Sequence, residues 1–466
     1  LKLGPPRKTV GARAGAGRRG GRRPAMPAMP RARAAGVVLA VFSEAARASR
    51  LRLPKANEDS SDYKLRMDNF NNVQYSAPLS VGSQTMPVIY DTGSFEILVL
   101  STMCHTCSRE HDFYDSKKSA TFLTAKGVTA EHLFGSGPVL SEKGYELVRV
   151  GRTASPYMVQ KMPFWQVIDH GIDVWNHNAH FSGIVGLGHP SHIPEGFSAE
   201  PVSDETLLSK MGVQQFAICL QRSGRPAAAP GWLMLGPSVG SLAAQSSAFR
   251  TVPVIGRVHW GVQLTSVRLE GGGPTMPVGG DPCSPSCGAI IDSGTSLIAV
   301  PPSAAGLTDH LSRMIRRDCS NLHSLPSLRM NIGGHDIELP PAAYVMQGYG
   351  GCKPGFMGID KQSQFGPVWI LGMPFLRYYF SIFDRASLSI HIAESTPACH
   401  MPAADMMLRG SVPNSPVLVN ATSGQGAAAG AASRAFAAAD FQPTPVDLNA
   451  TRIPGWAKEG YRSMDL

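Results

Sequence analysis

The strongest constraint on the fold of this chain is a short motif that occurs twice. Residues 88–94 read Val-Ile-Tyr-Asp-Thr-Gly-Ser, and residues 289–295 read Ala-Ile-Ile-Asp-Ser-Gly-Thr. Each copy is followed further along the chain by two apolar residues and a glycine, at residues 184–186 and 370–372. A single Asp-Thr-Gly is common in turns, because Asp and Gly both favour them. Two copies with matching downstream elements indicate an internal duplication instead.

The residue types in both motifs are those that a buried pair of carboxyl groups requires. Apolar residues before Asp91 and Asp292 predict that each aspartate lies at the end of a buried strand. The glycines that follow let the backbone turn tightly and approach a ligand, and nearby hydroxyl groups can donate hydrogen bonds to the carboxylates. The residues expected to support the two aspartates in this way are Thr92, Gly93, Ser94, Ser293, Gly294 and Thr295.

A two-fold relation between the duplicated halves would bring Asp91 and Asp292 face to face. Two like charges at close range cannot both ionise easily, so the pair would hold one shared proton. The ionised member could then remove a proton from a water molecule while the protonated member polarises a carbonyl group. This chemistry predicts amide hydrolysis without a covalent intermediate, with Asp91 and Asp292 as the catalytic residues.

At these residues the chain resembles the pepsin-like aspartic proteases, the group that includes pepsin and cathepsin D. The resemblance covers about residues 70–398 and includes the stretches 183–188, 369–372, 375–379 and 383–385. It implies a mostly β, bilobal fold, in which two pseudo-two-fold-related β-rich lobes enclose a central cleft and each contributes one aspartate. It also implies an aspartic-type endopeptidase that acts on peptide or protein substrates, favours acid pH, and needs no metal or organic cofactor.

The spacing of apolar residues favours the same fold class independently. Short Val, Ile, Leu and Phe runs between Gly and Pro predict a mostly β body. Few helices are expected, and the best candidate begins with Asp204 as its N-cap and ends at Met211. The expected organisation is a discounted upstream segment and a signal peptide within residues 1–48, a short prosegment-like lead-in at 49–70, an N-terminal lobe at 71–250, a C-terminal lobe at 251–398, and a flexible low-complexity tail at 399–466.

The signal peptide is expected to start at Met26 or Met29. Basic residues precede a short apolar core at residues 34–42, and a small-x-small site ends at Ala48. A short buried helix and an organellar transit peptide are the alternatives. The tail holds two Asn-Ala-Thr triplets, which would be glycosylated only in the secretory pathway. We therefore expect a secretory-pathway glycoprotein that is extracellular or endolysosomal/vacuolar.

The formal net charge of +9 belongs to the start of the chain. Residues 1–50 carry 12 Lys and Arg against one acidic residue, which leaves 31 basic and 33 acidic residues in the remaining sequence. The body therefore lacks the net positive charge of a nucleic-acid-binding domain. No stretch supplies the ~18 to 20 uninterrupted apolar residues of a membrane-spanning helix. We expect a monomer that binds peptides or proteins, with no nucleic-acid partner and no transmembrane segment.

Eight cysteines allow many pairings, and their spacing alone does not select one. The family resemblance implies three disulfides: Cys104–Cys107, Cys283–Cys287 and Cys319–Cys352. Cys219 lies in an apolar run and is expected to be a buried free thiol, whereas Cys399 has no evident partner. Cys104 and Cys107 could instead form a zinc or redox site with nearby histidines, but a second ligand pair is missing, so no metal site is expected. The histidines between residues 170 and 192 are expected to be scattered loop residues.

The segment that would cover the cleft departs from the family. By alignment, a hairpin called the flap should carry a Tyr before Gly-Ser/Thr-Gly, and here Phe134 precedes Gly135, Ser136 and Gly137. The Trp expected shortly after the first aspartate is Leu98. The family's Tyr–Trp hydrogen bond is therefore absent. An alternative function, a catalytically weak pepsin-fold protein that binds peptides or proteins, remains open beside the enzyme.

Overall fold

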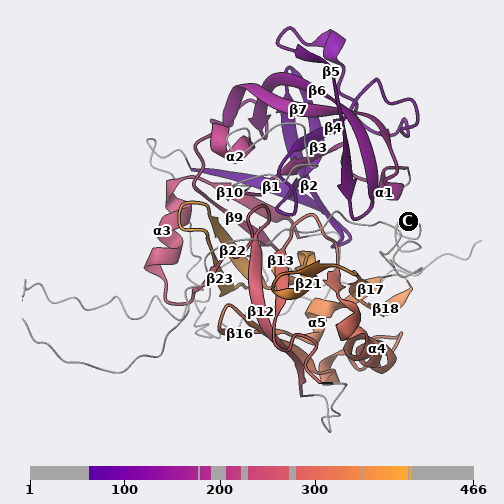
Figure 1. Ribbon diagram of the computed structural model, residues 1–466, viewed down its shortest axis with the longest axis vertical. Helices are drawn as coiled ribbons and strands as arrows, with labels where there is room; N and C mark the ends of the chain where they lie inside the picture. The colour runs from indigo at the N-terminus through magenta and orange to yellow at the C-terminus, as the bar shows by residue number, and fades with distance from the viewer. Residues whose placement is uncertain are drawn as a thin grey trace, which may run out of the picture. The chain divides into compact units, whose positions relative to one another are not determined.

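The computed structural model describes residues 62–176, 179–189, 206–221, 229–271, 280–348, 350–396 and 399 (Figure 1). All of them belong to one compact unit, which spans Arg52–Leu466. The expected signal peptide, most of the lead-in, and the tail after Cys399 with its two glycosylation triplets lie outside the described residues.

Strands dominate the described residues, which confirms the expected mostly β fold class. The largest sheet there has thirteen strands, in the order β11 (Arg250–Pro253), β23 (Ser389–Glu394), β22 (Tyr379–Asp384), β9 (Gln215–Leu220), β10 (Gly231–Leu235), β1 (Tyr63–Phe70), β2 (Gln74–Val81), β3 (Gln84–Asp91), β8 (Gly183–Gly186), β4 (Ile97–Leu100), β7 (Met158–His170), β6 (Gly137–Val150) and β5 (Leu123–Phe134).

A second sheet comes from the later part of the chain. Its order is β16 (His335–Leu339), β15 (Ser327–Ile332), β12 (Gly261–Glu270), β13 (Cys287–Ile291), β21 (Gly366–Leu371), β14 (Ile298–Val300) and β19 (Phe356–Gly358), with β20 (Gln362–Ser363) paired to β21. Strands β17 (Val345–Gly348) and β18 (Gly351–Pro354) form a separate pair. The α-helices of the described residues are short: α1 (Asp173–Asn176), α2 (Leu207–Lys210), α3 (Pro237–Gln245), α4 (Ala305–Met314), α5 (Pro341–Tyr344) and α6 (Met373–Leu376).

The internal duplication of the sequence is also a duplication of topology. Strand β8 lies between β3 and β4, parallel to β3 and antiparallel to β4. In the second copy, β21 lies between β13 and β14 with the same two orientations. Each downstream apolar-apolar-Gly element therefore fills the gap between the strand that carries an aspartate and the strand that follows it.

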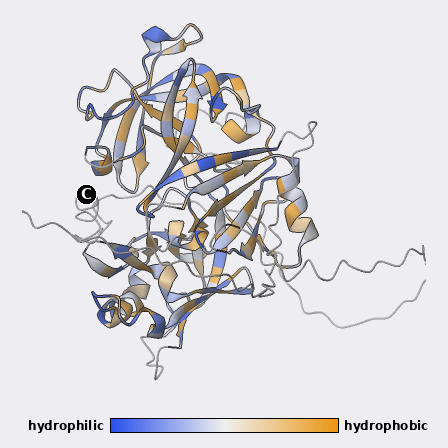
Figure 2. Cartoon of the chain, turned by 180° about the vertical axis from the view of Figure 1, so that it is seen from behind, coloured by the Kyte–Doolittle hydropathy of each residue, from blue (hydrophilic) through white to orange (hydrophobic). Residues whose placement is uncertain are grey.

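The two halves of the chain meet in one sheet. Strand β9 from the first half pairs antiparallel with β22 from the second half, with Ile218 opposite Ser381 (Figure 1). At this junction the Phe216 and Phe383 rings stack with centroids 4.8 Å apart, and Trp260 packs against both. Apolar residues follow the strands (Figure 2), so the core continues from one half into the other.

The end of the predicted lead-in forms part of this sheet. Residues Tyr63–Phe70 make β1, which pairs with β10 on one side and with β2 on the other. Leu65 and Met67 are buried in the main core. The sequence of this strand is polar because the side chains that alternate with these two, Lys64, Arg66 and Asp68, are exposed.

The predicted helix near residue 204 is shorter than expected. Helix α2 begins after Thr206, whose side chain accepts a hydrogen bond from the Ser209 N–H. The prediction of Asp204 as N-cap was therefore wrong, because Thr206 satisfies the free N–H groups at the helix start. Met211 is the C-cap, and Gly212 follows with a φ of 67°.

Candidate active site

The two aspartates of the repeated motif lie next to each other. Asp91 ends β3 and Asp292 follows β13 directly. A Cβ atom on Gly93 would lie 2.7 Å from the carboxyl carbon of Asp292, and one on Gly294 would overlap Oδ1 of Asp91. Each glycine is thus in contact with the carboxyl group of the opposite motif, and any side chain there would push the two loops apart.

Each carboxyl group receives the same pair of hydrogen bonds from its own loop. Oδ1 of Asp91 accepts the Gly93 N–H at 2.8 Å, and Oδ2 accepts the Ser94 hydroxyl at 2.5 Å. In the second copy, the Gly294 N–H and the Thr295 hydroxyl donate to Asp292 at 2.7 and 2.5 Å. These bonds fix both carboxyl groups in orientations related by the duplication.

The middle residues of the two motifs connect the loops to each other. The Thr92 hydroxyl donates to the Ile291 carbonyl at 2.8 Å and accepts the Ser293 N–H at 2.9 Å. The Ser293 hydroxyl donates to the Tyr90 carbonyl at 2.6 Å and accepts the Thr92 N–H at 3.0 Å. The sequence predicts support by these hydroxyls but not this reciprocal cross-brace, which depends on the fold to bring residues 92 and 293 together.

Burial and mutual repulsion control the charge of the pair. Asp91 and Asp292 are each 7% exposed. Burial raises the pKa of Asp91 well above its ordinary value, and the charge and hydrogen bond of Asp292 raise it further, against the opposing hydrogen bonds from Ser94 and Gly93. The Asp91 side therefore retains a proton under conditions in which an isolated aspartate is ionised.

His259 lies close to the dyad, and the buried His189 contacts its backbone; neither of them is assigned a functional role from the sequence. His259 lies two residues before β12 begins, and its ring interacts with the Asp292 charge and with the backbone of Gly93. Burial lowers the pKa of His259, while the Asp292 charge and the Gly93 carbonyl act in the opposite direction. His189 donates its Nε2–H to the His259 carbonyl at 2.7 Å, and burial lowers the pKa of His189 to about 4. His189 was expected to be a scattered loop residue, but its side chain is buried.

The expected flap is a hairpin at the edge of the large sheet. Strands β5 and β6 pair up to Phe134 opposite Gly137, and Gly135 and Ser136 form the exposed turn. Gly137 has a φ of 149°, and a Cβ there would overlap the Gly171 backbone, so only glycine fits. Phe134 is partly buried against the apolar cluster that contains Leu98.

The structure pairs all eight cysteines of the chain as disulfides. Three pairs are those that the family resemblance implies: Cys104–Cys107, Cys283–Cys287 and Cys319–Cys352. The fourth joins Cys219 to Cys399, so the prediction of a buried free thiol at Cys219 was wrong. Cys219 lies in β9, and β9 pairs with β22 shortly before the chain reaches Cys399. This long-range pairing has no signal in the spacing of the sequence.

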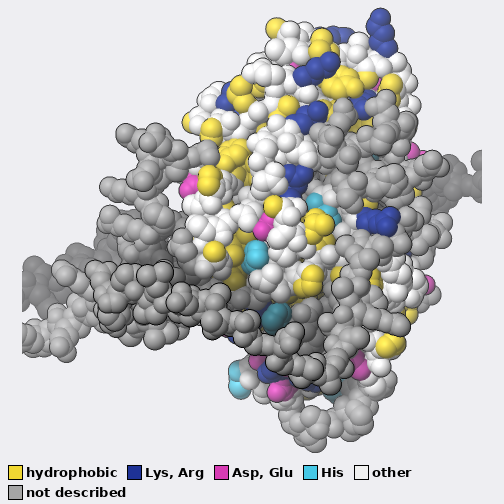
Figure 3. Space-filling view, turned by 60° about the vertical axis from the view of Figure 1, so that its left-hand side comes forward, with side chains coloured by type: hydrophobic (Ala, Val, Ile, Leu, Met, Phe, Trp, Pro, Cys, Tyr) yellow, Lys and Arg dark blue, Asp and Glu magenta, His cyan; other side chains and the backbone are white. Residues whose placement is uncertain are grey.

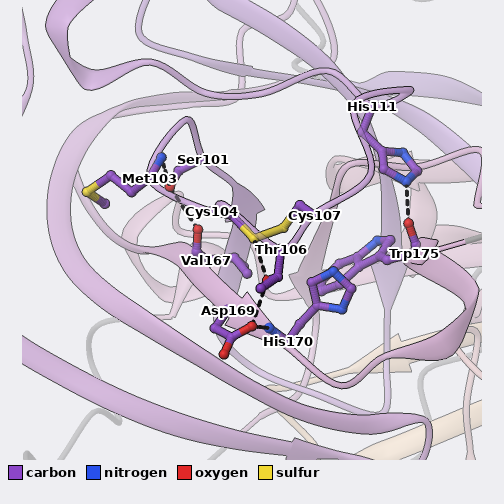
Figure 4. Close-up of a disulfide and its surroundings, with 10 residues drawn as sticks. All are labelled: Ser101, Met103, Cys104, Thr106, Cys107, His111, Val167, Asp169, His170 and Trp175. Atoms are coloured by element: carbon purple, nitrogen blue, oxygen red, sulfur yellow. Dashed lines mark hydrogen bonds between the residues drawn. A yellow bond between two sulfur atoms is a disulfide. The ribbon is translucent and has the colours of Figure 1, made fainter.

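The surroundings of Cys104 and Cys107 bear on the alternative metal site. Their sulfur atoms and a ring nitrogen of His170 lie within 4.8 Å of one another. The two sulfurs are bonded to each other, so neither offers a thiolate to a metal ion (Figure 4). Thr106, between the two cysteines, donates to Asp169 at 2.7 Å and ties the loop to β7. The disulfide is the better description of this loop.

Comparisons with known proteins identify the family. The sequence profile described as "Eukaryotic aspartyl protease" matches residues 74–395. Pepsin A of Bos taurus is 29% identical over 338 residues, covering 70% of this chain and 86% of the relative. Cathepsin E-A of Xenopus laevis is 30% identical over 341 residues, covering 71% and 81%. Pepsin-3 of Oryctolagus cuniculus is 29% identical over 358 residues, covering 73% and 86%. The chain belongs to the eukaryotic aspartyl protease family.

This membership confirms the predicted resemblance and makes the chain an aspartic-type endopeptidase that acts on peptide or protein substrates. Its four disulfides are typical of a protein of the secretory pathway. None of the helices in the described part of the chain has the length and hydrophobicity needed to span a bilayer. On the face shown in Figure 3, Lys and Arg side chains are scattered among apolar ones instead of forming one basic patch.

Proposed function

We propose that Asp91 and Asp292 form the catalytic dyad of this endopeptidase and that they act at acid pH. The observation that carries the proposal is the mutual contact of the two motifs, in which each glycine meets the opposite carboxyl group. The reciprocal hydrogen bonds of Thr92 and Ser293 hold this arrangement. Two carboxyl groups, buried together and equally supported, are suited to share one proton.

The proposed reaction follows from this shared proton. A water molecule between the carboxyl groups gives a proton to the ionised member, and its oxygen attacks the carbonyl carbon of the scissile peptide bond. The protonated member gives its proton to the carbonyl oxygen. The tetrahedral species then collapses: the C–N bond breaks, and the leaving amine takes up the proton that the initially ionised member received from the water. The proton belongs to the coupled pair before attack, and the raised pKa of Asp91 keeps it there.

The expected pH dependence has the same origin. The dyad works only while it carries one proton, so activity falls when the pH rises above the upper apparent pKa of the pair. It also falls when the pH drops below the lower apparent pKa, because both carboxyl groups are then protonated. Burial and the neighbouring charge both raise the pKa of Asp91, and together they keep one proton on the pair in mildly acidic solution.

Further parts of the proposal concern the substrate and its surroundings. Residues 134–137 at the tip of the β5–β6 hairpin cover the substrate, and lobes at residues 71–250 and 251–398 form the two sides of the cleft. We place the mature protein, as a monomer, outside the cell or in an endolysosomal or vacuolar compartment. The family membership and the disulfides support these assignments. The relatives named pepsin and cathepsin favour an enzyme over the alternative of a peptide-binding protein.

A peptide-library cleavage assay over a pH series tests the proposal. Wild-type protein should cleave peptides at acid pH, and a statine-type mimic, whose hydroxyl replaces the attacking water, should inhibit it. Asp292→Ala protein that remains folded should be inactive. Peptide binding without cleavage at any pH would favour the alternative function, and full activity of folded Asp292→Ala would overturn the mechanism.

A further inference from the structure

We infer that Glu96 is a positioning residue that fastens the flap hairpin to the loop carrying Asp91. This chain lacks the Tyr–Trp hydrogen bond that the family resemblance leads one to expect at Phe134 and Leu98. A different set of polar residues connects the same two parts of the molecule. The inference rests on the proposed hydrolysis at the dyad only for its kinetic consequences.

The contacts of Glu96 reach two separate strands. Its Oε2 lies 2.8 Å from Nδ1 of His132, which belongs to β5 and precedes Phe134 by two residues. Its Oε1 accepts the indole N–H of Trp165, in β7, at 2.9 Å. The Glu96 carboxylate therefore connects β5 to β7.

The second ring nitrogen of His132 completes the connection. Nε2 of His132 lies 2.7 Å from the hydroxyl of Ser141, which is in β6, the other strand of the hairpin. The His132 ring also packs edge-on against Trp165, with centroids 4.9 Å apart. The Glu96 carboxylate thus contacts β5 through His132, and His132 in turn contacts β6 through Ser141.

Glu96 is itself tied to the dyad by the backbone. Its carbonyl accepts the Gly186 N–H at 2.7 Å, and Gly186 is opposite Asp91 in the β3–β8 pairing. Two residues earlier, the Ser94 hydroxyl donates to Asp91. A shift of the Glu96 side chain would therefore move the hairpin relative to the Asp91 carboxyl group.

Burial makes this connection sensitive to a single change. The side chains of Glu96 and His132 are 10% and 5% exposed, and Trp165 is buried. Lys143 of β6 also lies beside Trp165, with its Nζ 5.9 Å from the ring centroid. Removing one partner leaves a buried polar group unsatisfied, whereas replacing both can be close to neutral.

The decisive variant is Glu96→Gln, which keeps an acceptor for Trp165 but removes the carboxylate that faces His132. The matched control is Glu131→Gln, which changes an exposed acid on the same hairpin strand. Glu96→Gln should raise KM for long peptides and the Kd of a statine-type mimic at least tenfold, with kcat within about threefold. Damage to the dyad itself would instead lower kcat and the fraction of titratable active sites, with KM unchanged.

Amide hydrogen exchange provides a readout that needs no catalysis. In the free protein, amides of residues 131–140 should exchange at least tenfold faster in Glu96→Gln than in the wild type or in Glu131→Gln. In the double variant Glu96→Gln/His132→Leu, which keeps an acceptor for Trp165, the losses in KM and Kd should be smaller than the sum of the losses in Glu96→Gln and His132→Leu. Unchanged exchange in folded Glu96→Gln, or additive losses in the double variant, would overturn the inference. Failure of every form to cleave peptides would contradict the proposed function and leave the exchange test of Glu96 intact.

Discussion

Thr92 and Ser293 exchange hydrogen bonds in both directions, each hydroxyl accepting the backbone N–H of the other residue, at 2.9 and 3.0 Å. The two residues are 201 positions apart in the chain. Both are buried, so water cannot replace a bond that is lost. The relative position of Asp91 and Asp292 depends on this pair, because each member lies directly after one of the aspartates.

The first prediction concerns the cross-brace. Thr92→Val and Ser293→Ala should each lower the free energy of unfolding by about 1–3 kcal/mol, because each leaves buried backbone groups unpaired. The double variant should lose less than the sum of the two, since both hydroxyls belong to one hydrogen-bonded network. Denaturant unfolding measures this, with Thr129→Val at an exposed position as the control. Additive losses would contradict a shared network.

The second prediction concerns the dyad. Asp91→Asn and Asp292→Ala should reduce kcat/KM by roughly 10²–10⁴-fold or more while the protein stays folded. The raised pKa of Asp91 adds a stability test. The stabilisation that protonated Asp91 contributes is fully present below about pH 3.8, the ordinary pKa of an aspartate. It is lost as the pH rises through the raised pKa. Relative to Asp91→Asn, the wild type should therefore lose stability between acid and neutral pH. The same pH dependence of the unfolding free energy in both proteins would contradict this.

The third prediction concerns His189, whose pKa is lowered to about 4 by burial. Between pH 6.5, the ordinary pKa of a histidine, and about pH 4, the lowered pKa of His189, the unfolded chain binds more protons than the folded protein. Acidification across this range should cost the wild type roughly 3 kcal/mol of unfolding free energy. His189→Gln should remove most of this cost, measured by urea unfolding at several pH values. The exposed His323→Gln serves as the control, and an equal acid response in all three proteins would refute the assignment.

The fourth prediction concerns the residues that replace the family's Tyr–Trp pair. Phe134→Tyr should change kcat/KM only slightly, because its hydroxyl would lack an indole partner. Combined with Leu98→Trp, it should show positive coupling of roughly 0.5 to 3 kcal/mol in a double-mutant cycle. Leu98 is 1% exposed and lies opposite Trp165 in the β4–β7 pairing, so overpacking can offset part of the gain. Strictly additive effects in a folded double variant would count against this account.

The fifth prediction concerns the unexpected disulfide. Cys399→Ser should lower the free energy of unfolding by about 2–5 kcal/mol, because Cys219–Cys399 closes a loop with a sequence separation of 180. Cys104→Ser opens a loop of separation 3 and should cost less on the chain-entropy account. Thermal unfolding measures both. Mass spectrometry of the non-reduced protein should find no free thiol among the eight cysteines, and an alkylated Cys219 would contradict the pairing.

Structural features that depend on residues close together in the sequence could be predicted from local patterns. Apolar residues followed by Asp-Thr-Gly or Asp-Ser-Gly placed both aspartates at strand ends, and the structure has them there. What depends on distant parts of the chain had no such signal. The Cys219 partner, the buried state of His189 and the contact between Glu96 and His132 all depend on residues that are distant in the sequence. The strand at Tyr63–Phe70 was also hidden, because alternate side chains on a strand with one solvated face are polar.

The pairing of β9 with β22 also sets the order in which the protein can be completed during synthesis. Ile218 leaves the ribosome well before its partner Ser381, which lies 163 residues later in the chain. At typical elongation rates the apolar edge of β9 waits roughly 10 to 30 s for its neighbour. An unpaired edge of this kind is a template for wrong strand pairing. The β9 edge therefore stays open to wrong pairing until translation has passed residue 384.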